Sequence, residues 1–419
     1  MRPSVHEFLR FAEAVFATLS TRFERERVWG PRSVFIAVLL LTRGRRRCTY
    51  RELMNDIMQD TAGLLSWVKS PSLSSFSVAR RKLDLDACRE ILRLLSARLG
   101  RMVPTRLRHP SGRRIIGFDG VRLITPGTAA TRRRFNEVPY SAWLTAHCPQ
   151  ALAVVAVDLM RRLPLDAVLL AKGKGERTGA MELLQHLESG DIAVMDRGFP
   201  SRALLGGFLA RGVDVVLRMT MAQAGSWPEV AAFAKTKALQ ATVEVRTEKG
   251  RTVPMRLIRR NFRIGRPRRG QLPQDMVIMT SLPASEFSRD EVIKLYAARW
   301  GVETVFREMK CEFDVERFHA RSVPGIEQEV LVVLAWFAFA AAIELTAQDQ
   351  LPGGRRVYRT LCITSAARVV EALLEGKDYA AAVRRGVEGA VRFHYAPRPG
   401  RSAVRECKSP VGRTRCKTK

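Results

Sequence analysis

The middle of the chain alternates short apolar runs of β character with helical segments, and this alternation constrains the fold more than any other feature. The β-type runs lie at 115–118, 152–157, 168–171, 191–195 and 213–217. Residues at helical spacing lie between the third and fourth runs and between the fourth and fifth. Strands that alternate with helices pack as layers around a sheet. The sequence therefore predicts an α/β domain.

The first 110 residues have apolar side chains at helical spacing and no sustained alternation, which predicts an all-helical N-terminal domain. Within it, a turn containing Ser and Pro at 69–72 precedes a short basic segment at 73–83. A turn followed by a basic helix is typical of the second half of a helix-turn-helix, although such pairs are common in helical proteins. We expect this domain to bind DNA through three adjacent cations, Arg80, Arg81 and Lys82.

A second strand-rich stretch follows the α/β pattern between 219 and 285. Its β-type runs lie at 241–246, 253–259 and 276–280 and are separated by Gly and Pro turns, which predicts a β-rich insertion. The stretch is dense in arginine, and such a loop suits contact with phosphates. We expect DNA contacts from Arg266, Arg268 and Arg269.

These patterns divide the chain into six predicted parts. A helical domain is followed by the first part of an α/β core, the β-rich insertion, the second part of the core, a helical C-terminal region and a basic tail. Their predicted bounds are 1–110, 111–218, 219–285, 286–345, 346–390 and 391–419.

The charge of the chain indicates the kind of partner. Lys and Arg number 71 against 41 Asp and Glu, a net charge of +30. An excess of this size favours a polyanionic partner, with nucleic acid the leading candidate; the alternative is a basic protein whose solvated faces carry the excess. Seven scattered cysteines without a C-x-x-C pair favour a reducing, cytoplasmic location. The apolar runs at 34–41 and 330–343 are short for a membrane span, so we expect core elements and no membrane partner.

Several common chemistries are absent from the sequence, and three carboxylates remain. The chain has no H-E-x-x-H and no G-x-S-x-G motif, and its K-G-K-G segment at 172–175 departs from the P-loop pattern, so we expect no nucleotide cofactor. Asp119 follows one short apolar run before Gly120, and Asp196 follows another before Arg197 and Gly198. Carboxylates at strand ends point into the crevice where α/β sheets bind ligands, but a strand that ends in such a motif is usually just a turn.

The third carboxylate, Glu303, lies in a helical segment with an unusual polar face. Tyr296, Arg299, Arg307 and Lys310 share that face with it, and an apolar stripe occupies the neighbouring sector. A single acid among cations is also compatible with an ion-pair network at i,i+4 spacing. The helix alone leaves both interpretations open.

The spacing Y-x2-R-x3-E-x6-K over Tyr296, Arg299, Glu303 and Lys310 resembles the signature of the bacterial DDE transposases of insertion sequence family four. The stretch 117–120 is similar to that family's first acidic motif, and 191–199 is similar to its second. The resemblance extends from about residue 40 to 345 and is specific in these three places. Val121 departs from it, since the family often has Ser or Thr there.

The resemblance implies an RNase H-like core, which is a mixed five-stranded sheet flanked by helices, with an all-β insertion and a preceding helical domain. Asp119, Asp196 and Glu303 would be the catalytic residues and the ligands of two Mg²⁺ ions, with Mn²⁺ able to substitute. The implied DNA contacts, taken with the polar helix face, are Tyr296, Arg299, Arg307, Lys310 and Arg197.

The implied activity is cleavage at the inverted repeats of an insertion sequence, through a hairpin intermediate, and joining of the 3′-OH ends to target DNA. The implied partners are double-stranded DNA and a second copy of the chain on paired ends, in a bacterial, nucleoid-associated setting. Three alternatives stay open: a structure-selective nuclease of the same fold, a catalytically inactive DNA-binding relative, and an RNA-processing enzyme.

Overall fold

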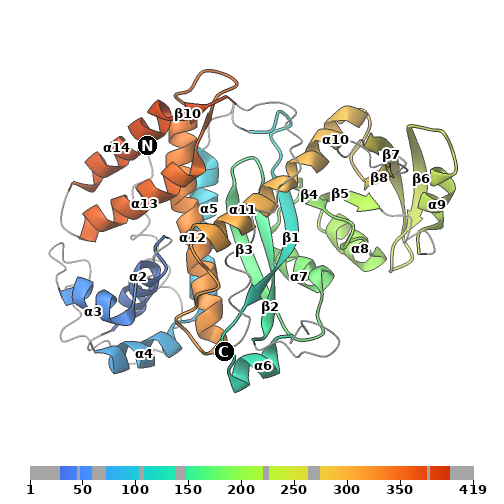
Figure 1. Ribbon diagram of the computed structural model, residues 1–419. Coiled ribbons are helices and arrows are strands. Elements are labelled where there is room, and N and C mark those ends of the chain that lie inside the picture. The colour runs from blue at the N-terminus through green and yellow to red at the C-terminus, as the bar shows by residue number, and fades with distance from the viewer. Residues whose placement is uncertain are drawn as a thin grey trace, which may run out of the picture.

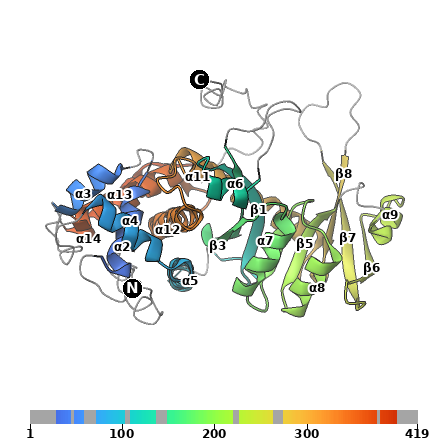
Figure 2. The same cartoon turned by 90° about the horizontal axis from the view of Figure 1, so that it is seen from below.

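The computed structural model describes residues 29–44, 48–58, 72–102, 108–136, 148–219, 226–262, 274–374 and 378–396. At its centre is an eight-stranded mixed sheet in the order β3-β2-β1-β4-β5-β8-β7-β6. Helices cover both faces of the sheet, and a helical body lies beside the β3 end (Figure 1). Seen from below, the helical body and the sheet form the two halves of the molecule (Figure 2).

The first five strands of the sheet form the mixed five-stranded core that the resemblance implies. Strand β2 runs antiparallel to both β1 and β3, whereas β1, β4 and β5 are parallel. The strands are rich in Val, Ile, Leu and Ala because both faces of this sheet are covered. Their bounds are β1 Ile115–Ile124, β2 Gln150–Asp158, β3 Leu163–Leu170, β4 Ile192–Met195 and β5 Asp214–Met219.

The β-rich insertion continues the same sheet. It contains α9 (Pro228–Ala234), β6 (Gln240–Arg246), β7 (Thr252–Phe262) and β8 (Gln274–Thr280). Strand β8 pairs antiparallel with β5 over its last residues, and β7 and β6 follow in order. This pairing gives hydrogen-bond partners to the edge of β5 that a five-stranded sheet would leave open.

The sheet separates two hydrophobic cores. One core lies under α7 (Glu176–Leu183), α8 (Arg202–Ala210) and α9. The other lies between the opposite face of the sheet and α10 (Arg289–Ala298), α11 (Trp300–Cys311) and the helical body. Side chains of a strand alternate between the two faces, so neighbouring residues of β4 contribute to different cores.

The helical body joins both ends of the chain in one core. In the residues that the structure describes, the N-terminal helices share a cluster with the C-terminal ones, so the predicted domains 1–110 and 346–390 pack together. The helices are α2 Pro31–Leu41, α3 Tyr50–Met58, α4 Leu73–Lys82, α5 Leu85–Met102, α12 Val323–Gln348, α13 Arg359–Leu374 and α14 Tyr379–Arg392. Shorter elements are α6 Ala129–Arg134, η2 Leu184–His186, β9 Arg356–Val357 and β10 His394–Tyr395.

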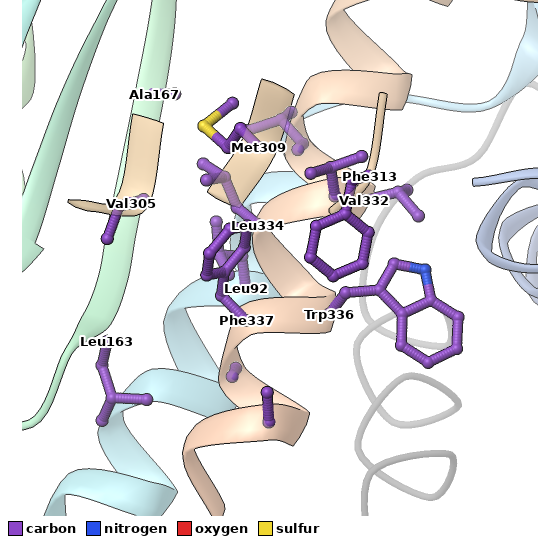
Figure 3. Packing of buried hydrophobic residues seen from close by; sticks show 14 of the residues in the cluster. Leu92, Leu163, Ala167, Val305, Met309, Phe313, Val332, Leu334, Trp336 and Phe337 are labelled. Carbon is purple, nitrogen blue, oxygen red and sulfur yellow. The ribbon is translucent and has the colours of Figure 1, made fainter. Parts of the chain in front are cut away.

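Helix α12 explains why the two ends meet. It is apolar on all sides and, by length and composition alone, could cross a membrane, but 78% of its most apolar window is buried inside the protein. A helix that is hydrophobic all round has to be covered all round. Figure 3 shows Leu334 and Phe337 of α12 beside Val305 and Met309 of α11, with Leu92 of α5 close by. The predicted core role of this apolar run is consistent with that packing.

Two predicted features fall on undescribed parts of the chain. Arg266, Arg268 and Arg269 lie outside the described residues, as does 397–419 of the predicted basic tail. The start of that predicted tail, however, forms the end of α14 and strand β10, which pairs with β9.

Candidate active site

The two aspartates stand side by side on neighbouring parallel strands. Phe118 of β1 is paired with Met195 of β4, and each aspartate is the next residue along its strand direction. Asp196 directly follows β4, as predicted. Asp119 differs from the prediction, because it lies inside β1 and the strand continues to Ile124. The continuation has a tertiary cause, since β2 pairs with β1 over this whole stretch after β4 has ended.

Glu303 reaches the aspartates because α11 packs closely on β1. A Cβ on Gly117 would lie 2.6 Å from Cγ2 of Val302, so only glycine at this position allows the helix to approach so closely. The preceding helix α10 begins at Ser288, whose side chain and that of Glu291 form a capping box. Arg299 joins the two helices, as the C-cap of α10 and the N-cap of α11.

Two residues of the sequence signature hold the three acids together. The buried Arg299 donates from Nη1 to Oδ2 of Asp119 at 2.8 Å and from Nη2 to Oε1 of Glu303 at 3.0 Å. The hydroxyl of Tyr296 donates to Oδ1 of Asp196 at 3.1 Å. Asp119 and Glu303 thus share the guanidinium of Arg299, whereas Asp196 is bound by Tyr296.

The electrostatics of this cluster are those of a site with too much negative charge. Burial raises the pKa of Asp119 to about 6; Arg299 opposes that rise, while the charges of Glu176 and Glu303 add to it. Burial and the charge of Asp196 also raise the pKa of Tyr296, which keeps its phenol protonated. Although burial opposes the charge of Arg299, the carboxylate of Asp119 raises the pKa of this guanidinium above its ordinary value.

A fourth carboxylate, Glu176, lies at this site and was missed by the sequence analysis. It is the first residue of α7 and follows the 172–175 segment, which forms a turn with Gly173 at φ 79°. Burial and then the charge of Asp196 raise the pKa of Glu176. Nothing in its local sequence marks it, because its position depends on how α7 packs against two distant motifs.

The residues predicted on the polar face of the Glu303 helix have different environments in the structure. Lys310 donates to the backbone oxygen of Arg122 at 2.7 Å and pairs with Glu316 at 2.9 Å, which ties the helix to β1. Arg307 is exposed. Of the ion pairs that i,i+4 spacing allows for Glu303, the described residues form the one with Arg299, at 3.0 Å, and not the one with Arg307.

The basic residues predicted on the helix-turn-helix have different environments. Arg81 and Lys82 are exposed at the end of α4. Arg80 is 5% exposed, pairs with Glu329 of α12 at 2.8 Å and also donates to Gln328. A guanidinium used in this way has no face left for phosphate, so the expectation for Arg80 is corrected. Arg197, after Asp196, is exposed.

The donor set at this site suits a hard divalent cation. Asp119, Asp196 and Glu303 offer only carboxylate oxygens, the ligands that Mg²⁺ and Mn²⁺ prefer. Within the described residues, no three acidic, His or Cys side chains are spaced to hold a metal as they stand. Instead, the guanidinium of Arg299 bridges Asp119 and Glu303, and it marks the position where positive charge is needed. The residues fit a divalent cation by chemistry and charge.

The sheet, with aspartates on neighbouring strands and a glutamate on the helix packed against them, is the arrangement expected of a transposase DDE domain. A family model described as a transposase DDE domain matches residues 111–337, more than half of the 419 residues, and the chain belongs to this family. Divalent-metal use is general in such domains.

Two individual proteins are similar to the chain. The transposase InsG for insertion sequence element IS4, from Escherichia coli strain K12, is 24% identical over 269 residues, which are 61% of this chain and 57% of that protein. The chain thus matches somewhat more than half the length of this curated relative, and the predicted resemblance to insertion sequence family four is confirmed. A cryo-EM structure of the piggyBac transposase synaptic complex with hairpin DNA has a TM-score of 0.45 and 12% identity, covering 98% of this chain and 86% of that one.

Proposed function

We propose that this protein is a DNA transposase that binds the terminal inverted repeats of an insertion sequence, cleaves the DNA at the element ends and joins the 3′-OH ends to target DNA. The observation that carries the proposal is the meeting of Asp119, Asp196 and Glu303 on Arg299 and Tyr296. A structural ion-pair network alone would not require acids from two parallel strands and a helix at one place.

Asp119, Asp196 and Glu303 would hold two Mg²⁺ ions, for which Mn²⁺ can substitute. When bound, such cations activate the attacking oxygen and offset the charge that develops on the leaving oxygen. Without them, the carboxylates would repel the phosphate that they have to approach. Burial raises the pKa of Asp119 to about 6, and the charges of Glu176 and Glu303 add to that rise.

The remaining signature residues would handle the DNA. Arg299 would contact phosphate only where cations take its place on Asp119 and Glu303, and its fork of donors matches phosphate geometry. Lys310 adds a point charge at the far end of α11. Tyr296 stays protonated and can donate its hydroxyl hydrogen to an acid or to a phosphate oxygen. In the proposed sequence of events, a freed 3′-OH attacks the opposite strand to form a hairpin, and joining follows hairpin opening.

Exposed cations away from the acids would carry the sequence-independent part of DNA binding. The proposed contacts are Arg81 and Lys82 on α4, Arg197 after β4, and Arg307 on α11. The net charge of +30 supports double-stranded DNA as the partner. Pairing of two element ends also requires a second copy of the chain, and we propose a homodimer on DNA, associated with the bacterial nucleoid.

The test uses the full chain, DNA from the borders of its own gene and a target plasmid, with and without Mg²⁺. We expect nicked, hairpin and joined products with the wild type, and binding without cleavage with Glu303→Gln. Nicks without joined products would instead indicate a structure-selective nuclease. A Glu303→Gln variant with unchanged activity would indicate a non-catalytic DNA-binding protein, and tighter binding to RNA would indicate an RNA-processing enzyme.

A further inference from the structure

The side chain of Glu176 fills the space beside both glycines that follow the two aspartates. A Cβ on Gly120 would come within 2.3 Å of Oε1 of Glu176, and a Cβ on Gly198 within 2.8 Å of its Oε2. Real Cβ atoms essentially never come so close to another heavy atom. With the Glu176 side chain in this position, neither glycine has room for a Cβ, although the two motifs lie far apart in sequence.

Glu176 approaches the aspartates from the face of the sheet opposite to Glu303. Gly117 of β1 faces Val302 of α11, whereas Gly120, three residues further, faces α7. The next residue of α7, Arg177, donates from Nε to the backbone oxygen of Gly198 at 3.0 Å. This bond ties the start of α7 to the loop after Asp196, and so keeps the Glu176 carboxylate beside the two aspartate motifs.

The carboxylate of Glu176 is short of a positive partner. It makes no hydrogen bond or ion pair with any other residue in the part of the chain that the structure describes. Around it, Asp119 and Glu303 share Arg299, and Asp196 has Arg218 at 3.6 Å. Four carboxylates thus face the guanidinium groups of Arg299 and Arg218 and the charge of Arg122. A half-buried acid that forms no ion pair is costly unless a cation completes it.

We propose that Glu176 is a fourth acidic residue of the active site, which supplies a further carboxylate to the hydrated divalent cation held by Asp119, Asp196 and Glu303. This inference rests on the proposed function and adds to it a ligand set drawn from both faces of the sheet.

The test measures Mn²⁺ binding to the full chain by electron paramagnetic resonance, in the presence of DNA from the gene borders. It compares the wild type with Glu176→Gln, with Asp119→Asn, and with Glu182→Gln, an exposed glutamate of the same helix. We expect Glu176→Gln to bind Mn²⁺ about 10-fold more weakly or worse, as is usual for a lost metal-shell carboxylate. Glu182→Gln should bind like the wild type, and Asp119→Asn more weakly still.

A second measurement separates metal binding from a structural role. In EDTA, Glu176→Gln should melt at the temperature of the wild type or above it, because the substitution removes a charge that repels Asp119 and Asp196. A residue that merely supports the fold would lower the melting temperature when neutralised.

Each outcome decides the matter. Weak Mn²⁺ binding by Glu176→Gln with an unchanged or raised melting temperature supports the inference. Wild-type Mn²⁺ binding by Glu176→Gln, while Asp119→Asn loses it, overturns the inference and leaves the proposed function standing. A melting temperature in EDTA well below that of the wild type also overturns it. A wild-type chain that neither binds Mn²⁺ nor cleaves DNA overturns both.

Discussion

Helix α11 takes part in two clusters of arginine and carboxylate, and they are built differently. At its N-cap, Arg299 pairs with Asp119 and Glu303, next to further acids. Further along the helix, Glu308 meets Arg359 at 3.1 Å and Arg162 at 3.4 Å, and both arginines also pair with Glu344 of α12.

The difference between the clusters is one of charge balance. Around Glu308 two arginines face two glutamates. Although burial opposes ionisation, Arg359 and Arg162 lower the pKa of Glu344 below its ordinary value, whereas burial raises the pKa of Glu308. Around Arg299 the acids are in excess, and burial raises the pKa of Asp119 to about 6. The balanced cluster fastens α11 to α12 and α13, whereas the unbalanced one leaves a need for positive charge that a cation or DNA-bound cation can meet. Such imbalance is typical of functional sites.

The largest expected effect comes from the unbalanced cluster. Glu303→Gln should reduce DNA cleavage by about 10³-fold or more, because it removes a carboxylate needed only for the chemical step. Binding to end DNA should change little. Glu308→Gln on the same helix is the contrasting variant: it should lower stability while the folded fraction still cleaves. Cleavage assays and DNA-binding titrations on both variants test this. Equal loss of cleavage in the two would contradict a catalytic role for Glu303 that Glu308 lacks.

Substitutions in the balanced cluster should change the free energy of unfolding. Arg359→Met leaves Glu308 and Glu344 buried with only Arg162, and breaking such a network costs about 3–5 kcal/mol in the free energy of unfolding. Urea denaturation measures this loss. Arg368→Met, at an exposed position of the same helix α13, is the control and should cost less than about 0.5 kcal/mol. A similar small loss for Arg359→Met would show that the cluster does not fasten the helices.

Replacing Asp119 with asparagine should stabilise the folded chain, by an amount that depends on pH. Its pKa of about 6 in the folded chain lies above the ordinary value of 3.8, so ionisation costs stability. The cost is full above about pH 6 and vanishes below about pH 4. In EDTA, Asp119→Asn should therefore raise the free energy of unfolding by about 2 kcal/mol near neutral pH and by almost nothing near pH 4.

Urea denaturation at the two pH values measures this effect, with the exposed Asp86→Asn as control. A variant less stable than the wild type at neutral pH would mean that the bond from Arg299 outweighs the cost of burying the charge.

The smallest expected effect is on the outer face of α11. Arg307→Ala should weaken DNA binding about 2- to 5-fold and reduce the slope of log K against log salt by about one, as for the loss of one phosphate contact. Binding titrations at several salt concentrations measure both quantities. Arg93→Ala is the matched control, because that exposed arginine is paired with Glu90. An unchanged slope would place Arg307 away from the DNA.

Much of the fold could be predicted because it depends on local patterns. The apolar runs predicted as strands overlap all five core strands, and the three runs of the insertion overlap β6, β7 and β8. The apolar stripe beside Glu303 is buried, including Val302, Val305 and Met309. Each of these features needs only the periodicity of a few neighbouring residues, which is set by backbone geometry.

Other features depend on partners that are distant in sequence. Arg80 has the composition of a DNA-binding residue, but Gln328 and Glu329, some 250 positions away, draw it into the core. Glu176 has no motif of its own and becomes part of the site because Gly120 and Gly198 leave room for it. The insertion joins the core sheet because β8 finds the open edge of β5.

The sequence by itself determined which residues of this protein form strands and helices, and which three acids are the candidates for the site. Tertiary structure decided which charges are neutralised and which are left in excess. The reason is physical: hydrophobic periodicity is a property of one segment, whereas the energy of a charge depends on its burial and on every charged group that packs around it.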